Sequence, residues 1–273
     1  MCITFFYISE DTQNDKYKLI LVMNRDEFFK RPTSQCDWEG DILAGRDQEP
    51  GKEGGTWLGM NKDGRVSLLT NIYAGKSSPG AGRGFLVINA LKEKYSKEYL
   101  TKLAESDTKY SPFNLLILDP NPEGSYEGQY YCRGLEGCVI KDSYGPVNLN
   151  AGFHGLSNHP KPCPYQKTVF GTKKLEELIG EKKDNENELI EHLFEMMTDK
   201  TSHHPDEQMI KQAGEKSQME SYHSKLACIN VDISERGYGS RVTSLILVDK
   251  ENNVTFIEKQ LLSDSKKIHK FKI

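Results

Sequence analysis

Three apolar runs in this chain lack the alternation of polar and apolar residues that marks a strand with one wet face. They span Leu19 to Met23, Phe113 to Leu118 and Val242 to Val248. Successive side chains of a strand point to opposite faces, so a continuous apolar run needs cover on both faces of its sheet. Two sheets packed face to face, each coated on its outer side by helices, provide that cover. The runs therefore predict a four-layer αββα sandwich.

Shorter patterns give the expected order of elements. A polar turn from Glu10 to Asp15 predicts a hairpin between the first strand and the first apolar run, and Asp63-Gly64 predicts another turn. Strands are further expected at Ile3–Ile8, Thr56–Met60, Val66–Ile72, Gln129–Cys132, Cys138–Lys141, Asn148–His154, Leu226–Val231 and Val254–Lys259, and helices at Phe85–Lys94, Lys97–Glu105, Tyr165–Ile179, from Asn185 onward and at Pro205–Ala213. Local strand pairs with segregated helices indicate an α+β fold with mostly antiparallel sheets. Residues 28–54 and 75–84 are predicted to be loops.

Composition limits the classes of protein to which the chain can belong. Its 273 residues, 36% of them hydrophobic, suffice for a sizeable core, and we expect a single domain over residues 1–273. A net charge of -4 argues against nucleic acid as a partner, because phosphate binding needs clustered Lys and Arg. No apolar run reaches the ~20 residues of a membrane-spanning helix. Six cysteines without CxxC or zinc spacing, and no secretory signal, predict reduced thiols and a cytoplasmic location.

Cys2 is the first candidate site residue, because it directly follows the initiator Met1. Removal of Met1 would leave a thiol and a free α-amine on one residue, with pKa values near ~8.5 and ~7.7–8. Such a residue can act as a nucleophile that uses its own amine as the base. In the alternative interpretation, Cys2 is a small buried hydrophobic residue.

The polar quartet Asn24-Arg25-Asp26-Glu27 follows the first apolar run directly and is the second candidate. Charged residues at the end of a buried strand lie at the rim of a sheet, where a site can be held rigidly. Strand alternation places Asn24 and Asp26 on one face and Arg25 and Glu27 on the other, so all four line one pocket only if the strand ends there. In the alternative interpretation, Arg25 bridges carboxylates in a structural network.

Weaker candidates come from single residues near strand ends. The amides of Asn71 and Asn158 could donate hydrogen bonds to an oxyanion, or both residues could simply stabilise turns. Cys163, which precedes Pro164, is a weak candidate for a thiolate ligand of haem, although the proline equally marks a helix start. No other metal site is expected. Gly75-Lys76-Ser77 lacks the first glycine of a phosphate-binding P-loop.

A series of motifs in order along the whole chain resembles the NRDE family, whose animal members are the transport and Golgi organisation 2 proteins. The motifs are Met1-Cys2-Ile3, Asn24-Arg25-Asp26-Glu27-Phe28 with Arg31-Pro32, Gly51 to Gly59, Leu69-Thr70-Asn71, Gly155-Leu156-Ser157-Asn158 and Tyr238-Gly239-Ser240-Arg241. The resemblance implies a sandwich similar to N-terminal nucleophile hydrolases. It also implies a role in haem movement or in acyl-CoA and lipid homeostasis, with links to Golgi organisation and mitochondria.

Within that wider fold the chain resembles the choloylglycine hydrolases, in which a terminal Cys, an Arg, an Asp, two Asn and a late Arg build the site. The matching positions are Cys2, Arg25, Asp26, Asn71, Asn158 and Arg241. Those amidases separate their early Arg and Asp by two residues, whereas the two are adjacent here. The departure favours a binding protein for an amphipathic ligand such as haem or an acyl-CoA, with Asn24 to Glu27 and Arg241 as ligand contacts and no required cofactor. The alternative is an amidohydrolase or thioesterase with Cys2, Asp26, Asn71 and Asn158 as catalytic residues.

Overall fold

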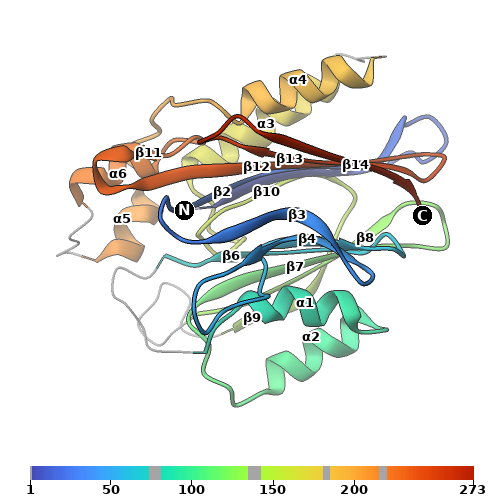
Figure 1. Cartoon of the computed structure of the whole chain (residues 1–273), viewed down its shortest axis with the longest axis horizontal. Coiled ribbons are helices and arrows are strands. Elements are labelled where there is room, and N and C mark those ends of the chain that lie inside the picture. Colours follow the sequence, from blue (N-terminus) through green and yellow to red (C-terminus); the bar gives the residue numbers. More distant parts are fainter. Residues whose placement is uncertain (1, 74–80, 135–142, 181–184, 215–219) are drawn as a thin grey trace.

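The long apolar strands are covered on both faces in the computed structural model of the chain, which describes residues 2–73, 81–134, 143–180, 185–214 and 220–273. Two sheets lie face to face, with helices on the outer side of each (Figure 1). Helices α3 (Gln166–Gly180) and α4 (Glu186–Met196) cover one sheet, and α1 (Gly84–Lys92) and α2 (Ser96–Glu105) cover the other. The predicted α+β, four-layer αββα arrangement is confirmed.

The first sheet contains both ends of the chain. Its strand order is β10 (Gly152–Leu156), β1 (Ile3–Ile8), β2 (Tyr17–Phe28), β12 (Tyr238–Asp249), β13 (Asn253–Gln260) and β14 (Lys266–Lys272), with the short β11 (Asp232–Ile233) pairing with β12. All of these pairings are antiparallel, and β1 and β2 form the predicted hairpin. The first and last quarters of the sequence therefore meet where β2 runs beside β12.

The second sheet follows the order of the sequence. It contains β3 (Thr33–Glu39), β4 (Ile42–Asp47), β5 (Leu58–Asn61), β6 (Val66–Asn71), β7 (Phe113–Pro120), β8 (Tyr126–Arg133) and β9 (Ser143–Leu149), each antiparallel to the next. The remaining helical elements are α5 (Glu207–Ala213), α6 (His223–Leu226) and the 3-10 turns η1 (Glu220–Tyr222) and η2 (Ser234–Arg236). Most of these lie near β11 and β12 at one end of the sandwich (Figure 1).

Alternation along β1 explains how one strand serves two cores. Phe6 lies between the sheets in a cluster with Leu68, whereas its neighbour Phe5 faces outward in a cluster with Leu175 of α3. Gly171 of α3 lies directly over Phe5, where an added Cβ would come within 2.1 Å of the phenyl ring. Each fully buried side chain of this size contributes about 1.5–3 kcal/mol to stability. The glycine allows α3 to approach the sheet closely.

Two of the predicted secondary-structure assignments are wrong for a physical reason. Residues 28–54 are not simply a surface loop, because they contain the β3–β4 hairpin. β3 is an edge strand whose only fully buried residue is Cys36, so its sequence is polar and gives little strand signal. The apolar run 226–231 is not a strand, because Leu226 ends α6 and the residues after it form a turn. A short buried turn has the same composition as a buried strand.

Other boundaries differ from the predicted ones. The strand expected at Asn148–His154 is two strands in different sheets, β9 and β10, and β14 was not predicted. The polar quartet does not end its strand, because β2 continues to Phe28 through pairing with β12. The strand expected at 138–141 and residues 75–80 of the second loop lie outside the described residues.

Candidate ligand-binding and nucleophile site

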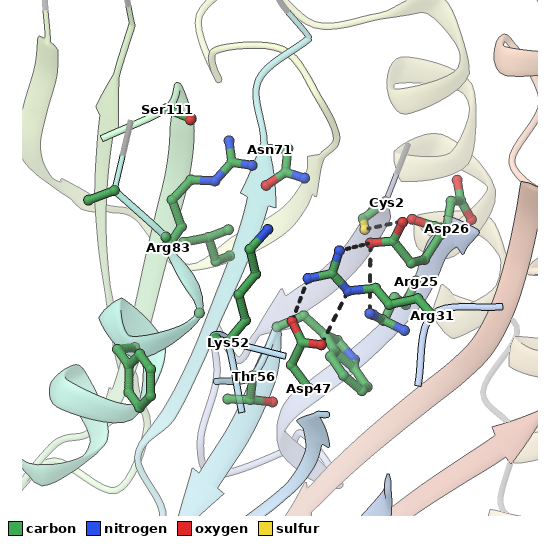
Figure 2. A pocket seen from close by; sticks show the side chains of 18 residues that line it. Cys2, Arg25, Asp26, Arg31, Asp47, Lys52, Thr56, Asn71, Arg83 and Ser111 are labelled. Atoms are coloured by element: carbon green, nitrogen blue, oxygen red, sulfur yellow. Dashed lines mark hydrogen bonds and ion pairs between the residues drawn. The ribbon is translucent and has the colours of Figure 1, made fainter. Parts of the chain in front are cut away.

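A cleft of about 360 Å³ opens where the two sheets meet the start of α1. Its walls come from segments far apart in the sequence, including the first residues, the end of β2, the segment before β5, the end of β6 and the first turn of α1. Charged side chains dominate its lining, namely Arg25, Asp26, Glu27, Arg31, Asp47, Lys52 and Arg83. Figure 2 shows Cys2 and Asp26 on one side of this cleft and Arg83 and Ser111 on the other.

Cys2 lies in the cleft wall beside the polar quartet. Pairing of β1 with β2 sets Ile3 opposite Asn24, and the thiol Sγ donates to the carbonyl oxygen of Asp26 at 3.8 Å. Ser157 donates its hydroxyl to the carbonyl oxygen of Cys2 at 2.8 Å, which fixes the backbone of this residue. Burial raises the pKa of the Cys2 thiol above its ordinary value. The thiol therefore stays protonated at neutral pH unless a nearby base accepts its proton.

Arg25 is a buried cation with unused hydrogen-bonding capacity. Its side chain is 6% exposed, and its guanidinium lies 4.0 Å from the ring centroid of Trp57. Its Nη2 is 3.8 Å from Glu27, which is too far for a hydrogen bond. Its buried Nη1 has no hydrogen-bond partner among the described residues. A buried donor without an acceptor is costly, so Arg25 is a candidate to donate a hydrogen bond to an anion in the cleft.

Asp26 reaches the same cleft because of an irregularity in the neighbouring strand. Asp26 pairs with Ser240 and Arg25 pairs with Val242, so Arg241 is the extra residue of a β-bulge in β12. Ser240 donates its hydroxyl to Oδ1 of Asp26 at 2.6 Å. Burial raises the pKa of Asp26, and the positive charge of the buried Lys167 acts in the opposite direction. Arg25, Asp26 and Glu27 all line the cleft, although alternation predicted that neighbours would face apart.

Asn24 is placed away from the cleft and holds the fold together. Its side chain is fully buried, and Nδ2 donates to the carbonyl oxygens of Met197 at 2.8 Å and Ile229 at 3.3 Å. Its Oδ1 accepts a hydrogen bond from the hydroxyl of Thr243 at 2.7 Å. These bonds fasten β2 to β12 and to the turns outside the first sheet. Asn24 is therefore a structural member of the quartet.

The two predicted oxyanion donors are placed differently. Asn71 lines the cleft at the end of β6. Asn158 is buried outside the lining, and its Nδ2 donates to the backbone carbonyl of Asn71. The structure thus leaves the Asn71 side chain as the candidate donor to a ligand, while Asn158 fixes the backbone that carries it.

Arg241 and Cys163 also lie outside the residues that line the cleft. Arg241 donates from Nη1 to the carbonyl oxygens of Phe28 at 3.0 Å and Arg31 at 2.7 Å, so it shapes the turn that follows β2. Cys163 is half-buried, and its backbone N–H donates to the carbonyl of Pro160 at 2.9 Å. Within the part of the chain that the structure describes, no cluster of three His, Cys, Asp or Glu side chains is arranged to hold a metal ion.

Several lining residues were not identified from the sequence. Arg31 makes a paired contact with Asp47, with Nε–Oδ1 at 3.2 Å and Nη2–Oδ2 at 2.6 Å. Arg31 is part of the Arg31-Pro32 motif, and that motif could have identified it as a site residue. Trp57 lies in the glycine-rich block at 51–59, but nothing in the sequence indicated that Arg25 stacks on its ring. Arg83 lies between two glycines and carries no recognisable signal.

Comparison with known proteins gives consistent relatives over nearly the full length. A family model described as Transport and Golgi organisation 2 matches residues 1–263. The human Transport and Golgi organization protein 2 homolog is 34% identical over 270 residues, covering 96% of this chain and 94% of that protein. Transport and Golgi organization protein 2 of Drosophila melanogaster is 30% identical over 274 residues, covering 96% and 92%.

Solved structures give more distant likenesses. A Caenorhabditis elegans ortholog of N-acylethanolamine-hydrolyzing acid amidase is 13% identical with a TM-score of 0.45, covering 70% of this chain and 85% of that one. A mutant of the conjugated bile acid hydrolase from Clostridium perfringens is 10% identical with a TM-score of 0.43, covering 100% and 97%. At these values the likeness supports no functional conclusion. No helix among the described residues is long and apolar enough to cross a membrane.

Proposed function

We propose that this chain, which belongs to the Transport and Golgi organisation 2 family, binds an amphipathic anionic small molecule in the cleft around Cys2 and Arg25. Haem and long-chain acyl-CoA are the two ligands of this class that the family resemblance implies. Binding would serve their movement between compartments or the homeostasis of lipids. We place this activity in the cytoplasm, with contacts to the Golgi or to mitochondria.

The observation that supports this proposal most strongly is the burial of the Arg25 guanidinium with one hydrogen-bond donor that has no acceptor among the described residues. A guanidinium that is buried, stacked on Trp57 and left with a free Nη1 donor is organised before any ligand arrives. A carboxylate or phosphate oxygen would accept a charge-assisted hydrogen bond from this donor. Trp57 and Leu69 add apolar surface to the same lining. The cleft therefore combines an anion contact with an apolar wall.

A thermal-shift titration of the full chain tests the proposal. Haem and dodecanoyl-CoA are each expected to raise the melting temperature of the parent chain, because a ligand that binds only the folded state stabilises it. Arg25→Gln should weaken binding by roughly 10- to 100-fold, since a hydrogen bond to a charged group is worth about 1.5–3 kcal/mol. Arg236→Gln, at an exposed arginine outside the cleft, is the matched control. Unchanged melting with both ligands would contradict the proposal.

A second candidate function is hydrolysis of an amide or thioester, which is favoured by the position of Cys2 in the cleft wall beside Asp26. After removal of Met1, the α-amine would take the thiol proton and the thiolate sulfur would form a bond to the carbonyl carbon. The carbon–nitrogen or carbon–sulfur bond to the leaving group would then break, and that group would take the proton. Asn71 would hold the oxyanion and water would release the acyl group.

Intact mass and covalent labelling distinguish the two functions. Hydrolysis requires that the purified chain has lost Met1 and that an acyl electrophile labels Cys2 over time. It also requires that Cys2→Ala abolishes release of the fatty acid from dodecanoyl-CoA. A chain that retains Met1 excludes the mechanism in which the amine of Cys2 acts as the base.

A further inference from the structure

The start of α1 forms a wall of the cleft, and its first turn contains no acidic residue. Gly82, Arg83, Gly84 and Phe85 line the cleft, and α1 begins at Gly84. The first turn of this nine-residue helix contains no acidic residue, and the residue before it makes no side-chain capping bond. A helix N-terminus presents backbone N–H groups and a partial positive charge, both of which attract anions.

The cations of this wall are also uncompensated. Arg83 donates from Nη1 to the carbonyl oxygen of Pro112 at 2.7 Å, which holds its guanidinium in place. Among the described residues, neither Arg83 nor Lys52 forms an ion pair with a carboxylate, whereas Arg31 is paired with Asp47. The acids of the cleft thus gather with Arg31 and Cys2, on the side opposite Arg83 (Figure 2).

An independent observation indicates that this cleft receives an anion. Arg25 lines the same cleft with a side chain that is 6% exposed, and its buried Nη1 has no hydrogen-bond partner among the described residues. Buried guanidinium donors are normally satisfied, so this donor is suited to bind an acceptor group of a ligand. In the part of the chain that the structure describes, Arg25 thus keeps one donor without an acceptor beside Cys2, although its Nη2 is 3.8 Å from Glu27. At the start of α1, Arg83 has no carboxylate partner among the same residues.

Glycines leave room at the start of α1. A Cβ added at Gly82 would meet no atom of the described residues within 4 Å, so these residues leave room for a ligand before the helix. A Cβ added at Gly84 would come within 3.0 Å of the backbone of Gly55, so the helix start lies tightly against the segment that leads to Trp57. The helix end is therefore fixed while the space in front of it stays open.

We propose that the first turn of α1, with Arg83 and Lys52, is the seat for an oxyanion group of the ligand. Phosphate and carboxylate share this chemistry. The rest of the ligand extends from this seat toward Arg25 and Cys2. The inference deepens the proposed binding function, on which it rests, because it divides the cleft into an anion seat and a second contact at Arg25.

A pair of substitutions at Gly82 tests the seat through charge alone. Gly82→Asp and Gly82→Asn are nearly identical in size, and both fit the open space. Aspartate next to the helix N-terminus would supply the missing negative charge and keep the melting temperature at or above that of the asparagine variant. In calorimetric titration of the full chain with pyrophosphate, Gly82→Asp should bind at least 10-fold more weakly than Gly82→Asn. Equal affinities of the two variants would overturn the seat. It would also be overturned if the parent chain bound neither pyrophosphate nor, in a second titration, laurate.

Arg83→Gln provides a second variant, with Arg236→Gln as the control outside the cleft. We expect Arg83→Gln to weaken binding of pyrophosphate or laurate about 10-fold or more. The anion whose affinity falls more shows whether the seat binds a phosphate or a carboxylate. If Arg83→Gln binds haem and dodecanoyl-CoA as tightly as the parent chain, the seat is wrong while the proposed function stands. If pyrophosphate binding depends on Arg83 but neither haem nor dodecanoyl-CoA binds, the proposed function fails and the seat stands.

Discussion

Burial sets the protonation states of the two titratable groups at the base of the cleft. The pKa values of Cys2 and Asp26 are both raised, in each case mainly by burial, so folding makes the charged form of each group less favourable than in the unfolded chain. Lys167, which is fully buried and donates to the carbonyl oxygens of Leu226 at 2.8 Å and Cys228 at 2.9 Å, partly offsets this effect for Asp26. A charged Asp26 is thus maintained at a cost in stability.

Replacing Asp26 by asparagine should remove the destabilisation that the ionised carboxylate causes. A carboxyl whose folded-state pKa is raised stabilises the fold below its unfolded value of about 3.9, and this contribution is lost as pH rises through the folded pKa. The melting temperature of Asp26→Asn should therefore exceed that of the parent more at pH 8 than at pH 4, because each pKa unit corresponds to about 1.4 kcal/mol. Ser240 can still donate to the asparagine oxygen. A difference that shrinks toward pH 8 would contradict this account.

Single residues of the site were partly predictable. Cys2 and Arg25 stood in motifs of the matched family, and both line the cleft. The separate roles of Asn24 and Asn158 could not be foreseen, because a buried amide that bonds to backbone carbonyls looks the same in sequence as one that faces a ligand. Arg83 was not predicted, because its position in the cleft wall depends on how distant segments of the chain pack together.

At the scale of elements, the contact between α3 and β1 supports the side of the first sheet that lies behind the cleft. Gly171→Ala would place a methyl group about where the Phe5 ring lies, at 2.1 Å from Cζ. Overpacking of this kind typically destabilises a protein by about 1–3 kcal/mol. Gly180→Ala in the same helix is the control, because its added Cβ meets no atom of the described part of the chain within 4 Å. Chemical denaturation should separate the two variants, and equal stabilities would show that α3 can shift without cost.

Elements with strong local signals were predicted well, and elements defined by their neighbours were not. The β1 strand and the β1–β2 hairpin were predicted correctly, because runs of consecutive apolar residues indicate that these strands are buried. The β3–β4 hairpin and β14 were missed because edge strands keep polar residues on an open side, as the alternating exposure of Lys266–Lys272 shows. The length of β2 beyond Met23 depends on its pairing with β12, which is more than two hundred residues away in sequence.

At the scale of the whole molecule, the cleft depends on the packing of the two sheets, because both contribute residues to its walls. Arg25 comes from the first sheet, and the Trp57 ring on which it stacks precedes β5 of the second. Ser157 connects the two, since its hydroxyl holds the carbonyl of Cys2 and its own carbonyl accepts from Thr70 of β6 at 2.6 Å. The site should therefore be lost in any condition that separates the sheets.

A crystal structure of the chain with dodecanoyl-CoA or haem, whichever gives the larger thermal shift, tests this account most directly. We expect the anionic group of the ligand within hydrogen-bonding distance of Arg83 and the first turn of α1, and a second polar contact at Nη1 of Arg25. A ligand bound elsewhere on the molecule, with the cleft holding only water, would contradict it.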